Sequence, residues 1–255
     1  MIHYLSVAFG SKLFYNFQKI KHSIFSLPGF DIYNYLITED DIYKTCQNDY
    51  EKQFLKNKPH LGYFSWKPRL IKKTLEKINV DDILIYSDVM DIIHPAILPK
   101  LKNYKFTDLI LLNGTYTNSY YTKQDCFDIM GCSSKKYYNS IQLEAGFSLW
   151  KKTQFSMSLL EEWERYCFNL YANGEDENLS GKVNAKEYVA HRWDQSILTN
   201  LKIKYQIPIF DADIRNYIEC NVDFFLKKNL KVSLLHNMVQ KFIIEKKSEF
   251  EFLNY

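Results

Sequence analysis

The chain has 255 residues, of which 46% are hydrophobic, so it can bury a large core as one α/β unit. Its 33 basic and 30 acidic residues nearly balance, which argues against a nucleic-acid-binding protein, because such a protein carries a clustered basic excess. No apolar run approaches the ~18 residues of a membrane-spanning helix, and the five cysteines lack C-x-x-C spacing, which favours reduced thiols in a cytosolic protein.

The N-terminal region predicts two strands, at 4–9 and 31–37, with a helix at 14–25 between them. The opening MIHYLSVAFG has no basic segment before its apolar stretch, so it indicates a strand and not a signal peptide. Gly10 follows this strand and allows a ligand to approach the backbone closely, although a lone glycine there is more often a simple turn.

The most informative segment is residues 62–95, GYFSWKPRLIKKTLEKINVDDILIYSDVMDIIHP. Pro68 suits the first turn of a helix, and apolar residues then recur on one helical face. The unbroken apolar run at 83–86 is typical of a strand covered on both sides, and Asp88 and Asp91 follow it. Ligands of open α/β sheets bind outside the carboxyl ends of strands, so two carboxylates there indicate a Mg²⁺ or Mn²⁺ site for a diphosphate.

Beyond this segment, the hydrophobic pattern predicts alternating strands and helices. The predicted elements are strands at 108–112 and 141–149, helices at 155–171 and 194–201, and an edge strand at 203–210. Between the two helices, the polar stretch 174–187 predicts a mobile surface loop. Every second residue of the strand at 141–149 is polar, so we expect one face of that strand to border a site.

Several ordered blocks of sequence resemble GT-A glycosyltransferases of bacterial and large-virus surface-glycan pathways. The blocks are the GYFSWKP loop with its helix, YTKQDCFDIMGC, QLEAGFSLWK, the helix containing Trp163, and HRWDQSIL. The metal motif of this family is usually Asp-x-Asp, whereas here it reads Asp88-Val89-Met90-Asp91. A spacing of three occurs in some relatives, such as the lysyl-hydroxylase-associated glycosyltransferase domains. The resemblance is weakest from about residue 210 onward.

This resemblance implies an α/β protein of the GT-A fold, a Rossmann-like mixed sheet flanked by helices, in a single domain. The nucleotide-sugar half would span about 1–112 and the acceptor half about 113–255. The implied donor is a UDP- or GDP-sugar, the cofactor is Mn²⁺ or Mg²⁺, and the acceptor is a glycan or lipid-linked sugar of surface polysaccharide (capsule, lipopolysaccharide or lipooligosaccharide) biosynthesis. Inversion and retention at the anomeric carbon both stay open.

For the donor, the resemblance assigns the base and ribose to the end of the first strand. The candidate donor-binding residues are Ala8, Phe9, Gly10, Trp66, Lys67, Ser87, Asp88 and Lys123. Lys67 lies at the start of a helix, where the helix dipole disfavours a cation and favours a phosphate. Two interpretations are therefore equally supported, a lysine that contacts the donor phosphate and a solvated lysine. Trp66 is more often an anchor than a base-stacking surface, and we expect it to support the site structurally. For Lys123 the alternative is a charged helix start.

The candidate metal ligands are Asp88, Asp91 and His236. Taken alone, the two acids could be ordinary turn residues. Many GT-A enzymes take a third ligand from a late histidine, and His191 competes with His236 for this role. The alternative for His236 is a structural histidine beside an apolar stretch.

The candidate catalytic residues are Asp194, Gln195 and Glu144. Asp194 could instead be the N-cap of the helix that follows it, and Glu144 could be a strand residue paired with a lysine. If the enzyme inverts, Asp194 or Glu144 would act as the general base for the acceptor hydroxyl.

Two functions of other classes stay open. One is a sugar nucleotidyltransferase, against which the missing Gly-rich loop near the N-terminus argues. The other is an inactive carbohydrate-binding or scaffold relative, against which the retained Asp88, Asp91 and Asp194 argue. We expect a cytoplasmic protein without nucleic-acid partners. Residues 224–231 are basic and aromatic enough to contact an anionic membrane from its inner face, although such stretches are more often solvated.

Overall fold

The structure is a computed structural model that describes most of the chain. The described residues are 1–10, 14–15, 18–19, 32–89, 91–93, 97–98, 101, 105–106, 108–209, 214 and 218–220. His236, the stretch 224–231 and most of the helix predicted at 14–25 lie outside these residues.

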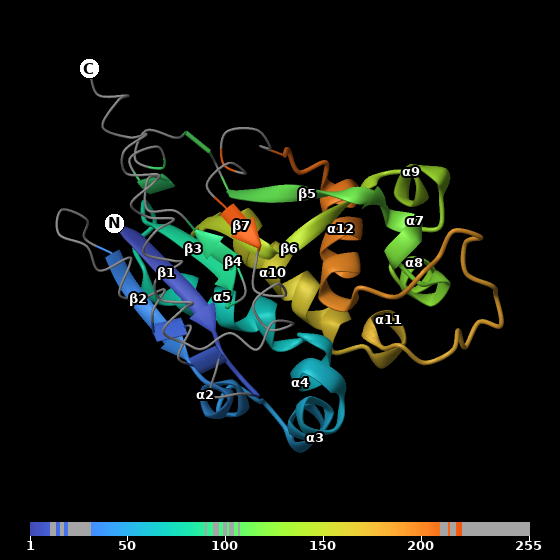
Figure 1. Cartoon of the computed structure of the whole chain (residues 1–255), viewed down its shortest axis with the longest axis horizontal. Coiled ribbons are helices and arrows are strands. Elements are labelled where there is room, and N and C mark those ends of the chain that lie inside the picture. The colour runs from blue at the N-terminus through green and yellow to red at the C-terminus, as the bar shows by residue number, and fades with distance from the viewer. Residues whose placement is uncertain are drawn as a thin grey trace.

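A five-stranded mixed sheet organises the described part of the chain, in the order β2-β1-β3-β6-β5 (Figure 1). Its strands are β1 (Ile2–Val7), β2 (Ile32–Ile37), β3 (Ile83–Asp88), β5 (Leu109–Thr117) and β6 (Ile141–Lys151). β1 runs parallel to β2 and β3, whereas β6 runs antiparallel to β3 and β5. The predicted mixed α/β sheet is therefore confirmed.

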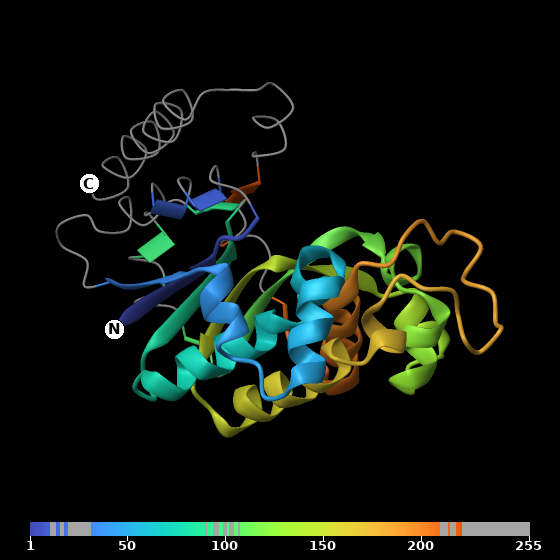
Figure 2. The same cartoon turned by 90° about the horizontal axis from the view of Figure 1, so that it is seen from below.

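Helices pack against one face of this sheet (Figure 2). The three longest are α5 (Trp66–Lys77), α10 (Gln154–Cys167) and α12 (Trp193–Tyr205). The shorter helices are α2 (Glu39–Tyr43), α3 (Asp49–Asn57), α4 (Pro59–Tyr63), α7 (Asn118–Tyr121), α8 (Gln124–Ile129), α9 (Lys135–Tyr138) and α11 (Leu170–Asn173). On the opposite face, the short strands β4 (Asp91–Ile93) and β7 (Ile218–Cys220) pair antiparallel.

The apolar run in β3 exists because both faces of the sheet are covered. Leu84 and Tyr86 belong to the hydrophobic cluster under α5, α10 and α12. Ile83 and Ile85 point the other way, into a second cluster that contains Ile93. Successive side chains of a strand alternate between faces, so a strand buried on both sides needs apolar residues at every position.

The predicted edge strand at 203–210 is wrong for its described residues. Residues 203–205 continue α12, which ends at Gln206 in the left-handed conformation. The N–H groups of Gln206 and Ile207 donate to the carbonyls of Ile203 and Lys202, which closes the helix end. The apolar residues Ile203 and Ile207 alternate with polar ones, but they are also four positions apart, a spacing that fits a helix equally well.

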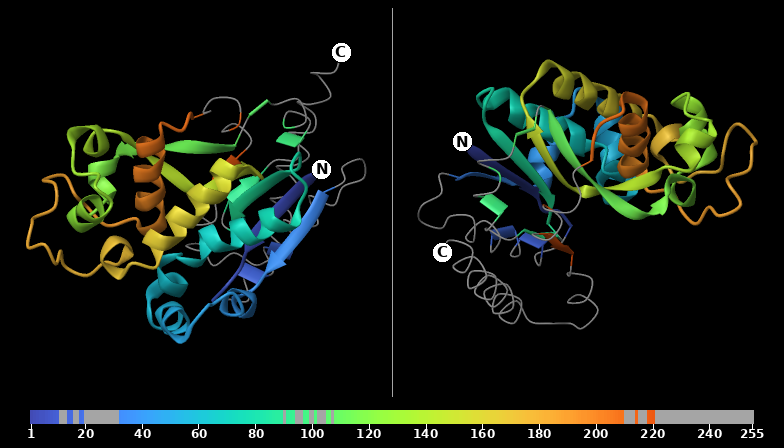
Figure 3. Two further views of the ribbon diagram at one scale, coloured as in Figure 1. Left: turned by 180° about the vertical axis from the view of Figure 1, so that it is seen from behind. Right: turned by 90° about the horizontal axis from the view of Figure 1, so that it is seen from above.

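The polar stretch 174–187 has no helix or strand, as predicted, and it extends outward beyond α8 (Figures 2 and 3). It is nevertheless tied to α8 by hydrogen bonds. The Asp125 carboxylate accepts from the N–H groups of Leu179 and Ser180, and the N–H of Gln124 donates to Asn184 Oδ1. Among the described residues, no helix combines the length and apolarity that crossing a bilayer requires.

Candidate active site

Lys67 connects three elements at the carboxyl end of β3. It lies in the first turn of α5, and only 3% of its side chain is exposed. Its Nζ lies 3.3 Å from Asp88 Oδ1, at the end of β3, and 3.0 Å from Asp194 Oδ2, in the first turn of α12. The same ammonium donates to the carbonyl of Ala145 in β6 at 3.2 Å. Two residues from opposite halves of the chain therefore share one buried cation.

The charges of this cluster depend on one another. Burial alone disfavours the Lys67 cation, but the carboxylates of Asp194 and Asp88 outweigh burial and raise the pKa of Lys67. Burial raises the pKa of Asp194 to about 6, and Asp88 adds to that rise while Lys67 opposes it. Lys67 therefore stays protonated, and Asp194 changes its charge within the physiological range.

Asp194 does not cap its helix, so the N-cap interpretation is wrong. α12 begins at Trp193, and its N-cap residue is Arg192, which makes no side-chain cap. Asp194 is instead buried, with 4% of its side chain exposed, and turned toward Lys67. Its Oδ2 is ion-paired to Lys67 but makes no hydrogen bond with the described residues. The indole N–H of Trp163 donates to the Asp194 carbonyl at 3.0 Å and holds the backbone there.

Asp88 is oriented by a second buried side chain that the sequence analysis did not single out. Tyr86, fully buried, donates its hydroxyl to Asp88 Oδ1 at 2.6 Å. Burial, together with the carboxylate of Asp88, raises the pKa of Tyr86 well above its ordinary value, so the hydroxyl remains a donor. The sequence spacing could have predicted this contact, because Tyr86 precedes Asp88 by two residues and alternate residues of a strand lie on the same face.

Asp88 and Asp91 converge on Gly146 of β6. A Cβ atom added to Gly146 would lie 2.5 Å from Asp91 Oδ2 and 3.4 Å from Asp88 Oδ2. A methyl group there would displace the Asp91 carboxylate, so the glycine makes room for both acids. Two carboxylate oxygens directed at one place form a hard-oxygen donor set that suits Mg²⁺ or Mn²⁺. The residues present thus fit the expected cation.

The third metal ligand is not found among the described residues, where no group of three or more His, Cys, Asp or Glu side chains gathers around one point. His191 does not qualify, because both of its ring nitrogens are engaged. Nδ1 accepts from the Lys123 N–H at 3.3 Å, and Nε2 lies 2.9 Å from the Ala172 carbonyl. Burial, with Lys123 adding to it, lowers the pKa of His191 to about 3, so this histidine is neutral and structural.

Gln195 and Lys67 hold the strand segment that carries Gly146. The side-chain oxygen of Gln195 accepts from the Ala145 N–H at 3.4 Å, while its amide donates to Gln142 at 3.0 Å. Because Lys67 donates to the Ala145 carbonyl, both the N–H and the carbonyl of Ala145 are hydrogen-bonded to side chains. Glu144 is partly exposed on the same strand, where the pairing with β5 shifts between Glu144 and Ser148. The expected single polar face is therefore interrupted, because Ala145 joins the cluster under the helices and Phe147 joins the opposite cluster.

Ser87 and Lys123, two other donor candidates, contribute differently. Ser87 is fully buried, and its hydroxyl donates to the Asp88 carbonyl at 3.0 Å, so it orients the strand end. Lys123 is buried beside α8, and its Nζ donates to the Asp176 carbonyl at 3.3 Å. Lys123 is the N-cap residue of α8, a helix that lies on the far side of α12 from β3 in Figure 1.

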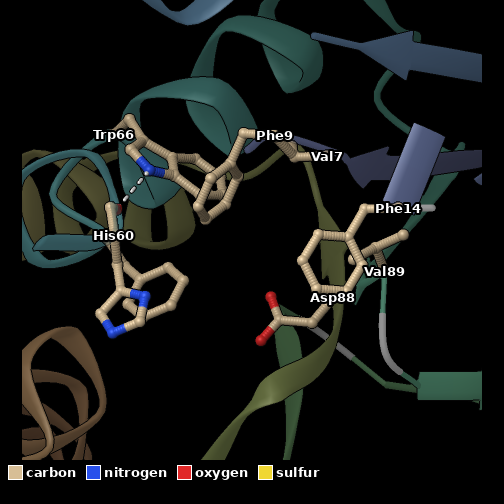
Figure 4. Close-up of a pocket in the computed structure, with 8 residues that line it drawn as sticks. Val7, Phe9, Phe14, His60, Trp66, Asp88 and Val89 are labelled. Atoms are coloured by element: carbon tan, nitrogen blue, oxygen red, sulfur yellow. Dashed lines mark hydrogen bonds between the residues drawn. The ribbon is translucent and has the colours of Figure 1, made fainter. Parts of the chain in front are cut away.

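A cavity of about 250 Å³ opens beside Asp88 (Figure 4). Its lining residues are Val7, Phe9, Phe14, His60, Phe64, Trp66, Asp88 and Val89. Among the sequence candidates, Phe9 thus reaches the cavity, and so does Trp66, which also donates its N–H to the His60 carbonyl at 3.4 Å. His60 and Phe64 also line the cavity and were not among the sequence candidates, although both flank the glycine of the GYFSWKP segment.

The other two candidates at the end of β1 lie beside this cavity without lining it. Ala8 is fully buried, and its N–H donates to the Ile37 carbonyl at 3.1 Å. Gly10 is exposed and has a φ of +81°, a conformation that favours glycine.

No protein-family model matches the chain, and no curated protein matches its sequence. Three solved structures are similar to it over most of both chains. Mouse xyloside xylosyltransferase 1 in its apo form has a TM-score of 0.46 and 10% identity, over 84% of this chain and 86% of that chain. Galactosyltransferase LgtC with donor and acceptor sugar analogs has a TM-score of 0.38 and 17% identity, over 79% of this chain and 70% of that chain. A glycosyltransferase involved in glycosylation of the major capsid of PBCV-1 has a TM-score of 0.36 and 13% identity, over 83% of this chain and 81% of that chain. Because these TM-scores are below 0.5, we base the functional assignment on the geometry of the site.

Proposed function

We propose that this chain is a metal-dependent glycosyltransferase of the GT-A fold, which moves a sugar from a nucleotide-sugar donor to a glycan or lipid-linked acceptor of surface polysaccharide. One observation carries the proposal: Asp88 and Asp91 converge opposite Gly146, beside an aromatic cavity, while Lys67 joins Asp88 to the buried Asp194. A cation site and a cavity for a flat ring suit a nucleoside diphosphate donor, and a carboxylate of raised pKa would supply the general base that an inverting transfer needs.

The cavity suits the nucleoside end of the donor. Its volume of about 250 Å³ lies below the roughly 300–1,000 Å³ of pockets that hold entire drug-sized ligands, so it would take only part of a nucleotide sugar. The aromatic rings of Phe9, Phe64 and Trp66 offer apolar faces to a base. Because Asp88 lines the same cavity, the diphosphate would extend from the nucleoside toward Asp88, Asp91 and Lys67.

Asp88 and Asp91 would hold Mn²⁺ or Mg²⁺, which when bound stabilises the negative charge that develops on the departing diphosphate. Tyr86 and Lys67 keep Asp88 Oδ1 in place, which directs the carboxylate toward Gly146. Lys67 also brings its own positive charge to the N-terminal end of α5, where the helix dipole favours phosphate.

Asp194 is the best candidate for accepting the proton of the acceptor hydroxyl if the reaction inverts. It is buried beside Lys67, and its pKa of about 6 lets it be ionised at neutral pH yet basic enough to take a proton. Gln195, next to it, keeps the Ala145 backbone in position at the edge of the reaction site. Glu144 on the neighbouring strand is the second candidate for contact with the acceptor.

A panel of UDP- and GDP-sugars, assayed with Mn²⁺ and with a chelator, tests the proposal. Metal-dependent release of the nucleoside diphosphate by the wild type, and its loss in Asp91→Asn, would support it. Exchange of nucleoside triphosphate with a sugar 1-phosphate would point to a nucleotidyltransferase instead. Binding of glycans without turnover of any donor would identify an inactive carbohydrate-binding relative.

A further inference from the structure

The short element α4 and Phe64, which follows it, form a left-handed turn and not an ordinary α-helix, an unusual conformation for residues other than glycine. Five consecutive residues have positive φ: His60 (52°), Leu61 (53°), Gly62 (70°), Tyr63 (55°) and Phe64 (60°). Four of them carry a Cβ atom and are therefore strained in this region. Such strain persists only where the surroundings enforce it, and it is concentrated at ligand-binding sites.

Three neighbouring helices hold the turn in this conformation. Gly62 packs so tightly on α3 that an added Cβ would lie 2.8 Å from Phe54 Cδ1 and 2.9 Å from Leu55 Cδ2. The side-chain amide of Asn173 in α11 donates to the Tyr63 carbonyl at 3.2 Å. Trp66 of α5 donates to the His60 carbonyl at the other end of the turn. The strain is thus maintained from several sides.

The turn stacks His60 on Phe64 at the cavity wall. Their ring centroids are 5.0 Å apart and the rings are inclined by only 8°. Trp193, which directly precedes Asp194, lies 4.8 Å from the His60 ring, so that ring has aromatic neighbours in both Phe64 and Trp193. Figure 4 shows the imidazole facing the cavity across from Asp88.

His60 is the polar side chain that this wall offers to a ligand. Around it, Val7, Phe9 and Phe64 present only carbon atoms to the cavity, and Asp88 already accepts from Tyr86 and pairs with Lys67. Burial lowers the pKa of His60, with Glu175 opposing the shift, so the imidazole is neutral at pH 7 and has one donor and one acceptor nitrogen. A nucleoside has polar edges that would lose hydrogen bonds in a purely apolar cavity.

We propose that His60 is a specificity-determining residue for the donor, whose imidazole edge hydrogen-bonds the nucleoside while Phe64 and Trp193 hold the plane of the ring. The inference rests on the proposed function and adds to it the residue that recognises the nucleoside. It also explains the strained turn, which brings residues 60 and 64 together on one side of the cavity.

Calorimetric titration with UDP, GDP and inorganic pyrophosphate, each with Mn²⁺, tests this role. His60→Phe keeps an aromatic ring for stacking but removes both nitrogens. It should weaken binding of the preferred nucleoside diphosphate about tenfold, the value of one hydrogen bond, and leave pyrophosphate affinity unchanged. In turnover assays KM for the donor should rise while kcat is retained, because binding would be lost equally in the ground and transition states.

The matched control is Tyr63→Phe, which removes a hydroxyl from the same strained turn, at a buried residue that does not line the cavity. It should bind all three ligands like the wild type. If His60→Phe melts at a lower temperature, His60→Asn provides a second test. Asparagine enters the left-handed region readily, but it is too short to replace the imidazole edge, so the same loss is expected.

Two results would overturn the inference while leaving the proposed function intact. One is nucleotide affinity in His60→Phe equal to that of the wild type. The other is an equal loss of pyrophosphate affinity, which would mean that His60 acts on the phosphates and not on the nucleoside. If the wild type binds no nucleotide at all, the proposed function fails and the inference fails with it.

Discussion

Lys67 and Asp194 form an ion pair at 3.0 Å in which both side chains are almost completely buried. Removing two charges from water costs free energy that their attraction often fails to recover, so a buried ion pair is weak evidence for stability. Here Asp88 also shares the lysine, and Asp88 borders both the cavity and the Gly146 position. We therefore interpret Lys67, Asp88 and Asp194 as residues that serve the reaction and not the stability of the fold.

We expect Asp91→Asn to abolish metal-dependent donor binding without unfolding the protein. Asparagine preserves size, but the cation loses an anionic ligand, while repulsion with Asp88 is relieved when no metal is bound. The loss of transition-state stabilisation should be several kcal/mol, on the order of a thousandfold in rate. Calorimetry of nucleoside diphosphate with Mn²⁺ gives the answer, and unchanged affinity would reduce Asp91 to a turn residue.

Asp194→Asn should lower kcat by roughly 10²- to 10⁴-fold, the usual contribution of a general base, and leave donor affinity nearly unchanged. The helix start should survive, because Asp194 is not its cap, and Lys67 keeps Asp88 and the Ala145 carbonyl as partners. Steady-state kinetics and thermal melting on the same preparations separate the two effects. Near-normal turnover would remove Asp194 from the catalytic residues.

The rate should fall as the pH is lowered through about 6, the raised pKa of Asp194. Below this pH the carboxyl is protonated and cannot accept a proton, and Asp194→Asn should lack this step in its pH–rate profile. Stability depends on pH in the opposite direction. Because the pKa of Asp194 is higher in the folded protein than its ordinary value of 3.8, the free energy of unfolding falls as the pH rises from about 4 to about 6 and Asp194 ionises. A pH–rate profile without a step near 6 would contradict this role.

Gly146→Ala should impair the cation site directly. Its Cβ would lie 2.5 Å from Asp91 Oδ2, so the carboxylate must move away from Asp88, and Mn²⁺-dependent nucleotide binding should be lost. Gly181→Ala, in the loop beyond α8, is the control: its Cβ would meet nothing within 4 Å, so its only cost is backbone strain at a φ of +68°. Equal Mn²⁺ affinity in the two variants would show that the acids do not need the space at Gly146.

Tyr86→Phe should weaken Mn²⁺ binding by roughly 10- to 100-fold, as loss of a partner that orients a metal ligand commonly does. The hydroxyl donates to Asp88 Oδ1 at 2.6 Å and is the only atom that the substitution removes. The free energy of unfolding should fall by about 1 kcal/mol. Titration of Mn²⁺ in the presence of nucleoside diphosphate measures the first effect, and denaturant unfolding measures the second.

Local patterns in the sequence determined the strands and the position of the acidic pair. The apolar run of β3 reflects burial on both faces of the sheet, which the hydrophobic pattern records directly. The alternation in β6 predicted the strand but not its irregularity between Glu144 and Ser148, where the apolar residues change face. Asp88 and Asp91 follow a buried strand, and the carboxyl end of such a strand is where α/β sheets bind ligands. The helical pattern after Pro68 likewise placed Lys67 at the start of α5.

Only the tertiary structure decided which side chains meet. The alternation at 203–207 fits either a strand or a helix, and α12, packed against β6, continues through Ile203 to Tyr205. The partner of Asp194 is a lysine from the other half of the chain, and His60 enters the cavity through a strained turn that residues of three other helices maintain. Such contacts arise between segments far apart in sequence, and no local periodicity encodes them, because periodicity reports burial and not the identity of the neighbour.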